Sequence, residues 1–308
     1  MSRILVTGAA GFVGAAVADL AAREGHQVTA LVRNPAAPRV VALAGRCAIA
    51  VADLADAAAV RAALIQARPD IIIHSAWEGV GGPARAGDIQ IDNIRTTLAL
   101  LDAAIAVGAR RFIGIGSQAE YGRHDCRIDE SAATIPFLLY GAAKLSACHL
   151  TRQRAGEAGL GWAWLRLFSP YGPGDNPGWL IPSVTAQMLA GDTPRTSPGT
   201  QKWDYLHIVD CARGILAAAI TDSAQSVFNL SSGRAVAVRA IVEQLRDIAR
   251  PGLPLRFGDI PFGPNQIMHL EGDCSRLTAA TGWTPRIALE DGLVTVVDAL
   301  KKMARQAA

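Results

Sequence analysis

The sequence predicts an α/β protein built on a doubly wound parallel sheet, with a smaller, interleaved α/β unit in its C-terminal half. Two observations carry this prediction. Short apolar runs alternate with longer helical patterns over the first half of the chain, and the runs are continuous in Val, Ile and Leu, as in RILVT and DIIIHS. Strands of a parallel sheet have this continuous character because helices bury both of their faces.

The elements of the first half follow from the period of their apolar residues. Strands are expected over residues 3–7, 27–32, 47–51, 70–75, 111–116 and 162–167, and helices over 11–23, 56–67, 88–107 and 139–157. After Phe168 the chain becomes rich in Pro and Gly, which predicts loops. WDYLHIVD (203–210) is expected to be a strand that enters a helix, and SVFNLS (226–231) another strand. From about Arg234 we expect short helices between Pro-Gly turns.

This order of elements predicts two interleaved domains. A dinucleotide-binding domain takes residues 1–167 and about 203–228, and a substrate-binding domain takes about 168–202 and 229–308. A chain of 308 residues is long enough to bury both cores.

Composition and charge exclude several classes of function. The net charge of +3 is small and no run of Lys or Arg is long, so we expect neither nucleic acid nor a membrane surface as a partner. No signal-like segment precedes RILVTG, and we expect a cytoplasmic protein. The five scattered cysteines suit a reducing compartment, and the six histidines lack metal-ligand spacing, so we expect no metal.

The first expected turn carries a glycine triad. In VTGAAGFVG, Gly8, Gly11 and Gly14 follow the first strand and open the first helix. Without a Cβ they permit a tight turn and a close approach to a pyrophosphate, which the N–H groups of the helix N-terminus then bind. A purely structural turn is the alternative, but the position after the first strand favours a dinucleotide. Further cofactor contacts are expected from Ala10, Phe12 and Val13.

The end of the second expected strand favours NADP over NAD. An acidic residue there would bind the ribose 2′-hydroxyl and a basic one a 2′-phosphate; TALVRNP offers Arg33 and no acid. NAD stays possible, because a solvated loop cation is the other explanation of Arg33. Asp53 and Leu54, after the third strand, are candidates for the adenine side, and a helix N-cap is the alternative for Asp53.

Tyr140 and Lys144 in LLYGAAKLSA stand four residues apart on one face of an expected helix. A nearby ammonium lowers the pKa of a phenol, so the tyrosine can exchange a proton with a hydroxyl or carbonyl while hydride moves. A buried tyrosine beside a solvated lysine is the alternative. The glycine triad makes catalysis the leading interpretation.

These motifs resemble those of one family, the extended short-chain dehydrogenase/reductases of the NAD-dependent epimerase/dehydratase type. The resemblance rests on TGAAGFVG, on YGAAK, and on Ser117 ahead of Tyr121-Gly122. It extends through IIIHSAW, RLFSPYGPG, WDYLHIVD and TGWTP over nearly the whole chain. It implies a Rossmann-type fold, a nucleotide-linked sugar as substrate, and a homodimer formed through helices 88–107 and 139–157. It also implies cofactor contacts from Ser75, Ala76, Asn93, Lys144 and Phe168.

The resemblance gives Ser117 a role as well. The family's catalytic Ser or Thr stands five residues before the Gly of a Tyr-Gly pair, and Ser117 holds that place. It is therefore expected to donate a hydrogen bond to the reacting sugar oxygen. A nucleophilic role is disfavoured because the sequence has no Gly-x-Ser-x-Gly elbow around it. A serine that ends a strand and caps a turn is the alternative.

The residues after Ser117 narrow the reaction. The family's 4,6-dehydratases carry acidic residues there to move protons, but this chain has Gln118 and Ala119. Glu120, in a strand-like segment, is expected on the opposite face. The remaining hypotheses are a 4-keto-6-deoxyhexose reductase, favoured by Arg33, and an NAD-dependent nucleotide-sugar 4-epimerase. A non-catalytic NADP-binding regulator is a further alternative.

The substrate side is predicted from the resemblance alone. Ser169 stands where many relatives carry Asn, and Trp203 where many carry an Arg near the nucleotide pyrophosphate. Trp77 would wall the sugar pocket and Glu78 would hold a sugar hydroxyl, while Trp179 would line the base pocket; ordinary packing and solvation are the alternatives. The expected substrate-binding residues are Trp77, Glu78, Gln118, Ser169, Leu180, Ile181 and Trp203.

Overall fold

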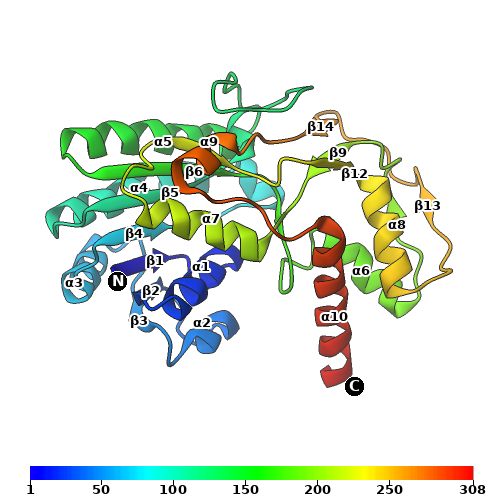
Figure 1. The fold of residues 1–308 in the computed structure, drawn as a ribbon, viewed down its shortest axis with the longest axis horizontal. Coiled ribbons are helices and arrows are strands. Elements are labelled where there is room, and N and C mark those ends of the chain that lie inside the picture. Colours follow the sequence, from blue (N-terminus) through cyan, green and yellow to red (C-terminus); the bar gives the residue numbers. More distant parts are fainter. Residues whose placement is uncertain (308) are drawn as a thin grey trace.

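A seven-stranded parallel sheet forms the centre of the computed structural model, which describes residues 1–307 (Figure 1). Its strand order is β11-β6-β5-β4-β1-β2-β3, and every neighbouring pair is parallel. Strands β2 and β3 lie on one side of β1, and β4, β5, β6 and β11 lie on the other. This change of direction between β1 and β4 defines a doubly wound sheet and its switch point. The strands are β1 (Arg3–Thr7), β2 (Gln27–Val32), β3 (Ala48–Val51), β4 (Ile71–His74), β5 (Arg111–Ser117), β6 (Gly161–Leu167) and β11 (Val227–Leu230).

Helices cover both faces of this sheet, as the continuous apolar strands predict. Ile4 and Val6 of β1 face one core, and Leu5 between them faces the other. The first core is covered by α1 (Phe12–Arg23), α2 (Pro38–Leu43) and α7 (Ile208–Ile220). The second is covered by α3 (Ala57–Ala67), α4 (Ile89–Ala106) and α5 (Leu139–Glu157).

The C-terminal half builds a second, smaller core beside the sheet, on the right in Figure 1. It joins α6 (Leu180–Ala190), α8 (Val238–Ala249) and α10 (Leu289–Ala307). Short strands flank it: β7 (Pro170–Tyr171), β8 (Arg195–Thr196), β9 (Lys202–Asp204), β10 (Leu206–His207), β12 (Ala235–Ala237), β13 (Arg256–Phe257) and β14 (His269–Leu270).

The fold class and the expected strands and helices of the first half are confirmed to within a residue or two. Three segments differ. Helix α2 lies in a segment expected to be a loop. WDYLHIVD contains two short strands before α7 begins at Ile208, and α10 is nineteen residues long rather than short.

The two-domain division stays a prediction. The position of one helix disagrees with assigning all of residues 229–308 to the substrate-binding domain. Although α9 (Ser275–Thr281) falls in the part assigned to the substrate domain, Leu277 and the nearby Trp283 pack into the core of the large sheet. The Trp283 indole nitrogen donates to the carbonyl of Asp210 on α7 at 3.1 Å. Residues around α9 therefore return to the dinucleotide-binding unit.

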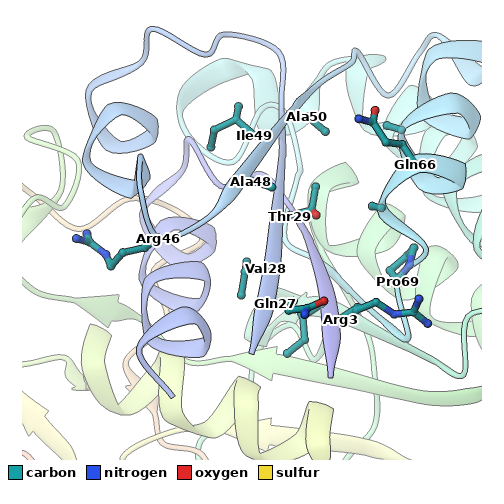
Figure 2. Close-up of a pocket in the computed structure, with 13 residues that line it drawn as sticks. Arg3, Gln27, Val28, Thr29, Arg46, Ala48, Ile49, Ala50, Gln66 and Pro69 are labelled. Atoms are coloured by element: carbon teal, nitrogen blue, oxygen red, sulfur yellow. The ribbon is translucent and has the colours of Figure 1, made fainter. Parts of the chain in front are cut away.

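A hollow of about 430 Å³ opens beside β2 and β3, with Arg3, Gln27 and Pro69 around it (Figure 2). Arg3 and Gln27 begin their strands, so this hollow lies at the amino-terminal edge of the sheet. No predicted site residue lines it. Ligands of open α/β sheets bind at the opposite, carboxyl edge, and the candidate site is built there.

Within residues 1–307, no helix is both long and apolar enough to cross a membrane.

The same residues contain no cluster of His, Cys, Asp or Glu arranged to hold a metal ion. All five cysteines are free; Cys126 is exposed and the other four are buried.

Candidate functional site

The glycine loop is shaped for a close backbone approach. Gly8 has a φ of +71°, and a Cβ there would lie 2.6 Å from the backbone nitrogen of Ala76. A Cβ on Gly14 would lie 2.3 Å from the Gly8 carbonyl oxygen. Helix α1 begins after Gly11, which offers no side-chain cap, so its first N–H groups stay available to a ligand. These residues fit a dinucleotide pyrophosphate. Ala10, Phe12 and Val13 belong to the same turn.

Arg33, at the tip of β2, forms an ion pair with Glu78 from the loop after β4. Both side chains are largely exposed. The pair joins loops that follow the strands on either side of β1. Arg39 on α2 lies against the glycine loop. Its guanidinium donates to the carbonyls of Ala10 and Gly174 and stands 6.0 Å from the ring centroid of Phe12. Arg33 and Glu78, predicted for different ligands, thus contact each other.

The segment after β3 does not use Asp53 as a helix cap. Asp56 is the N-cap of α3, and its carboxylate accepts from the N–H groups of Ala58 and Ala59. The carboxylate of the exposed Asp53 accepts only from the N–H of Ala55, at 2.9 Å. The N-cap explanation of Asp53 is therefore wrong, and its adenine contact stays a prediction together with that of Leu54, which is half-buried.

A buried hydrogen-bond chain positions the loop after β4. His74 stands between Thr7 of β1, 2.8 Å from its Nδ1, and Thr97 of α4, 2.9 Å from its Nε2. Burial lowers the pKa of His74 to about 3, so its imidazole is neutral. The Thr7 hydroxyl also accepts from the N–H of Ala76 at 3.2 Å. Ser75 and Ala76 are thereby held against Gly8, at the switch point of the sheet.

The rest of that loop is fixed by two side chains of α4. Asn93 donates to the carbonyl of Glu78 and accepts from its N–H, both at 3.0 Å. The buried Gln90 accepts from the Trp77 indole at 2.8 Å and donates to the carbonyls of Gly79 and Ala84. Asn93 thus braces the loop, and its direct cofactor contact stays a prediction.

Tyr140 and Lys144 lie on one face of α5, as their spacing predicts, and Trp77 touches both. The Lys144 ammonium stands 3.8 Å from the Trp77 ring centroid and donates to the carbonyl of Ile115 at 2.6 Å. The Trp77 and Tyr140 rings meet edge to face at 6.5 Å. Arg85, from the short helix η1 (Gly82–Ala86), places its guanidinium 4.3 Å from the centre of the Tyr140 ring.

Two groups beside Tyr140 lower its pKa and so oppose the effect of its burial. Burial raises the pKa of Tyr140, whereas the hydrogen bond with Ser117 and the Arg85 guanidinium lower it. Burial lowers the pKa of Lys144 to about 7, and the negative charge of Glu120 raises it. A phenol beside a serine, on the same helix face as an amine whose pKa burial brings to about 7, is suited to proton exchange.

Ser117 is the last residue of β5, and the short helix η2 (Gln118–Glu120) follows it. Its hydroxyl accepts from the N–H of Ala119 at 3.2 Å, so the capping role and the contact with Tyr140 coexist. The side-chain oxygen of Gln118 is buried without a hydrogen-bond partner in the described structure. A buried, unpartnered amide oxygen beside Ser117 is free to accept from a ligand hydroxyl.

Glu120 differs from the sequence expectation. The segment after Ser117 is helical rather than strand-like, and it brings the carboxylate back beneath the backbone of Ser117. The carboxylate accepts from the N–H of Ser117 at 2.9 Å and pairs with Arg166 at 2.7 Å. Glu120 is fully buried and committed to these partners. It is thus withdrawn from proton transfer to a sugar, for a different reason than the one predicted.

On the sugar side, two predicted residues contact each other. The Trp203 indole donates to the Ser169 hydroxyl at 2.6 Å. Ser169 has a φ of +27°, a conformation that Asn adopts more readily than other non-glycine residues. This agrees with the Asn that the family resemblance places there. Phe168 is fully buried against Tyr121. Its predicted cofactor contact would therefore come from its backbone, and this contact stays a prediction.

The start of α6 faces the loop after β4. A hollow of about 390 Å³ lies between residues 79–82 and residues 176–179. Trp179, 42% exposed, borders it, and its ring would lie 3.3 Å from a Cβ on Gly81. Leu180 is half-buried, whereas Ile181 packs into the core of the small unit. Substrate contacts by these residues stay predictions.

Sequence reasoning missed three residues of the site: Arg85, Gln90 and Arg166. The contacts of Arg85 and Gln90 depend on how the loop after β4 folds back, and no local sequence pattern predicts these contacts. Arg166 had a signal, because a charged residue inside the buried strand WAWLRL must find a buried partner.

A model of the NAD dependent epimerase/dehydratase family matches residues 4–231. The chain is 29% identical over 303 residues to a UDP-glucose 4-epimerase of Corynebacterium glutamicum, covering 92% of this chain and 91% of the relative. It is 30% identical over 314 residues to a dTDP-6-deoxy-L-talose 4-dehydrogenase (NAD(P)(+)) of Kitasatospora kifunensis, with 95% and 93% covered.

A solved structure gives the same result. UDP-glucuronic acid 4-epimerase from Bacillus cereus, in complex with UDP-glucuronic acid and NAD, superposes with a TM-score of 0.86 at 25% identity, covering 97% of this chain and 99% of that one. These matches span the glycine loop, Ser117, Tyr140 and Lys144. The chain belongs to the NAD dependent epimerase/dehydratase family, whose members here are enzymes that modify nucleotide-linked sugars.

Proposed function

We propose that this protein carries out oxidoreduction at C4 of a nucleotide-linked hexose, and that its first candidate reaction is reduction of a 4-keto-6-deoxyhexose with NADPH. One observation supports this most. Ser117 at the end of β5 lies beside Tyr140, one turn of α5 from Lys144, at the carboxyl edge of the sheet that carries the glycine loop. A proton donor, a neighbouring hydroxyl and a cation are thus grouped where a dinucleotide binds.

The chain's own residues divide the work. The N–H groups of the loop from Gly8 to Gly14 bind the dinucleotide pyrophosphate, and Lys144 holds the ribose next to the nicotinamide. When bound, the cofactor supplies or accepts hydride. Ser117 donates a hydrogen bond to the sugar oxygen at C4, and the Tyr140 hydroxyl donates its proton to that oxygen. Lys144 stabilises the resulting phenolate through its positive charge.

Elimination of water, the third reaction among the family's relatives, is not supported. It needs an acid and a base at the positions after Ser117, which here hold Gln118 and Ala119. Glu120 is bound by the Ser117 N–H, Trp164 and Arg166. The unpartnered oxygen of Gln118 is instead suited to accept from a sugar hydroxyl.

The Arg33–Glu78 pair gives the second candidate, a 4-epimerase that retains NAD. A carboxylate beside Arg33 disfavours a 2′-phosphate there, because the two negative groups compete for one guanidinium. The Bacillus cereus relative has NAD bound. Reduction with NADPH requires Arg33 to exchange Glu78 for the phosphate, whereas binding of NAD leaves the pair intact.

Net consumption of cofactor separates the two reactions. Purified protein is mixed with NADPH or NADH and with 4-keto-6-deoxyhexoses carried on dTDP, GDP or CDP, and the absorbance of the reduced nicotinamide is followed. Stoichiometric loss with one carrier supports the reductase and identifies the nucleotide. No loss with any of them, followed by interconversion of UDP-hexoses with NAD, supports the epimerase. No reaction in either assay, with cofactor bound, contradicts both and supports a non-catalytic regulator.

We also propose a homodimer through α4 and α5. The two helices pack together, and each leaves a large apolar side chain on its outer surface: Ile91 is 41% exposed and Leu150 46%. Light scattering after size-exclusion chromatography tests this proposal. A dimeric wild type and a monomeric Leu150→Asp variant support it, and a monomeric wild type contradicts it.

A further inference from the structure

A buried carboxylate lies directly behind the catalytic serine. Both oxygens of Glu120 are used: Oε1 accepts from the Ser117 N–H at 2.9 Å and from the Trp164 indole at 2.9 Å, and Oε2 accepts from Arg166 at 2.7 Å. Glu120 is completely buried and Arg166 is 4% exposed. The Arg166 guanidinium also stands 4.4 Å from the centre of the Tyr121 ring.

The neighbouring strand is shaped to admit this cluster. A Cβ on Gly114 would lie 2.1 Å from the Trp164 ring, and a Cβ on Gly116 would lie 2.2 Å from its indole nitrogen and 2.5 Å from Glu120 Oε1. The two glycines of RFIGIGS thus leave room on β5 for an indole from β6 and for the carboxylate. Three elements, β5, η2 and β6, combine to bury one negative charge next to Ser117.

Burying an ion pair is expensive, and a well-packed apolar pair is often at least as stable. A buried ion pair at this place is therefore weak evidence of a role in stability alone. The charge lies close to Lys144: Glu120 accepts from the Ser117 N–H, and Lys144 donates to the carbonyl of Ile115, two residues earlier on the same strand. In keeping with this geometry, Glu120 raises the pKa of Lys144 against its burial, and it also raises the pKa of Tyr140.

Other charged groups surround the same helix face. Arg85 of η1 lies over the Tyr140 ring, and Arg166 of β6 pairs with Glu120. His74 of β4 is neutral, because burial and Lys144 both lower its pKa. Tyr140 and Cys148 of α5 are neutral at pH 7, because burial raises the pKa of the Tyr140 phenol and of the Cys148 thiol. Among the described residues, Glu120 is therefore the anion whose charge acts on Lys144.

We propose that Glu120 is a positioning residue of the site: its buried carboxylate holds the backbone of Ser117 in place and sets a fixed negative charge beside the Lys144 ammonium. The proposal rests on the proposed function for what Ser117 and Lys144 do, but its electrostatic part does not require a sugar substrate. Arg166 and Trp164 fix the carboxylate, so that its distance from the catalytic residues does not vary.

The isosteric variant Glu120→Gln tests the charge while keeping an acceptor for Ser117 and Trp164. Loss of a negative charge near an ammonium favours the neutral amine, so the titration midpoint of Lys144 should fall below its value near 7 by roughly one pH unit, a tenfold change in the acid constant. A merely structural role would leave this midpoint unchanged.

The midpoint is measured by NMR on protein labelled with ¹³Cε-lysine. The chain has only four lysines, so the Lys144 signal is assigned by its absence from a Lys144→Met variant. Glu130→Gln is the matched control. Glu130 is another buried glutamate that accepts a backbone N–H, from Asn229 at 2.7 Å, and faces an arginine, Arg276 at 3.6 Å. The control should leave the Lys144 midpoint where it is.

A second variant covers the case in which an unpaired Arg166 prevents folding. Glu120→Gln with Arg166→Gln replaces the ion pair by an amide pair, and it should lower the midpoint by a smaller amount. An unchanged midpoint in every folded variant overturns the proposal, as does an equal shift in Glu130→Gln.

In the wild-type enzyme, the basic limb of the pH profile of kcat/KM should follow the Lys144 midpoint and move with it in Glu120→Gln. If no sugar nucleotide is turned over by the wild type, the proposed function fails, while the lysine titration still decides the role of the Glu120 charge. A shifted lysine midpoint with an unshifted activity profile overturns the link between that charge and catalysis.

Discussion

The cofactor side and the sugar side of the site are built differently. The cofactor side, formed by the glycine loop, the loop after β4, Ser117 and the start of α5, is held by short contacts to buried backbone, such as Ala76 against Gly8. On the candidate sugar side, Trp203 of β9 donates to the Ser169 hydroxyl, and Trp179 borders a hollow of about 390 Å³. The first side has little freedom to vary, whereas the second can change its shape with a few substitutions. This difference explains why chemistry is easier to predict than substrate in this fold.

The largest expected effect is on the cofactor side, at Tyr140. Tyr140→Phe removes the proton donor while keeping the ring between Trp77 and Arg85, and kcat should fall by roughly 10²–10⁴-fold. Steady-state kinetics with the sugar nucleotide that the cofactor-consumption assay identifies measures this fall in kcat. Tyr121→Phe is the control: its hydroxyl donates to Asn229 at 2.7 Å inside the core, so that variant should lose stability but not kcat. Equal losses of kcat in both variants would remove Tyr140 from the mechanism.

The glycine loop offers the next test. Gly14→Ala places a methyl group 2.3 Å from the Gly8 carbonyl, so we expect a loss of stability of roughly 1–3 kcal/mol and at least tenfold weaker cofactor binding. Gly156→Ala, also within a helix but with open space around it, should instead stabilise the protein by up to about 1 kcal/mol. Thermal unfolding and fluorescence of bound NADH measure the two effects. Unchanged cofactor affinity in Gly14→Ala would refute the role of the loop.

Gln118 lies where the two sides meet, and it gives a smaller effect with a distinct signature. Its buried oxygen has no partner, so Gln118→Met should leave the stability of the ligand-free protein unchanged or raise it. The same change should raise the KM for the sugar nucleotide by roughly tenfold, because one hydrogen bond to a hydroxyl is lost. A loss of stability with an unchanged KM would mean that Gln118 serves the fold alone.

The smallest expected effect concerns cofactor choice. Glu78→Gln frees Arg33 from its carboxylate partner, so the ratio of kcat/KM for NADPH to that for NADH should rise several-fold, within the range for an exposed charge pair. Arg33→Ala should lower the same ratio. If both variants leave the ratio unchanged, neither residue contacts the 2′-position of the ribose.

Much of the cofactor side could be predicted from the sequence because its constraints are local. Gly8, Gly11 and Gly14 follow a strand, and Tyr140 and Lys144 share a helix face; both patterns act over a few residues. The sequence could not reveal the environment of Glu120, because the helical turn after Ser117 and the space left by Gly114 and Gly116 arise from three separate segments. The expectation of a strand there had the wrong period.

The sugar side resisted prediction for the same reason. The Ser169–Trp203 contact joins a loop residue to a residue of β9 that is 34 positions away, and no local period connects the two. The resemblance named both residues but assigned them to the substrate, without the contact between them. Specificity on that side depends on such loop packing, so substrate identity follows from measurement and not from motifs.

The central claim is that Tyr140 and its neighbours transfer a proton to the sugar oxygen while hydride passes directly between cofactor and C4. The most direct test uses NADPH carrying deuterium at C4 of the nicotinamide, with NMR of the sugar product. The account predicts deuterium at C4 of the hexose in the wild type, and at least a hundredfold slower labelling in Tyr140→Phe. Deuterium at another carbon, or labelling at an undiminished rate in the variant, would contradict it.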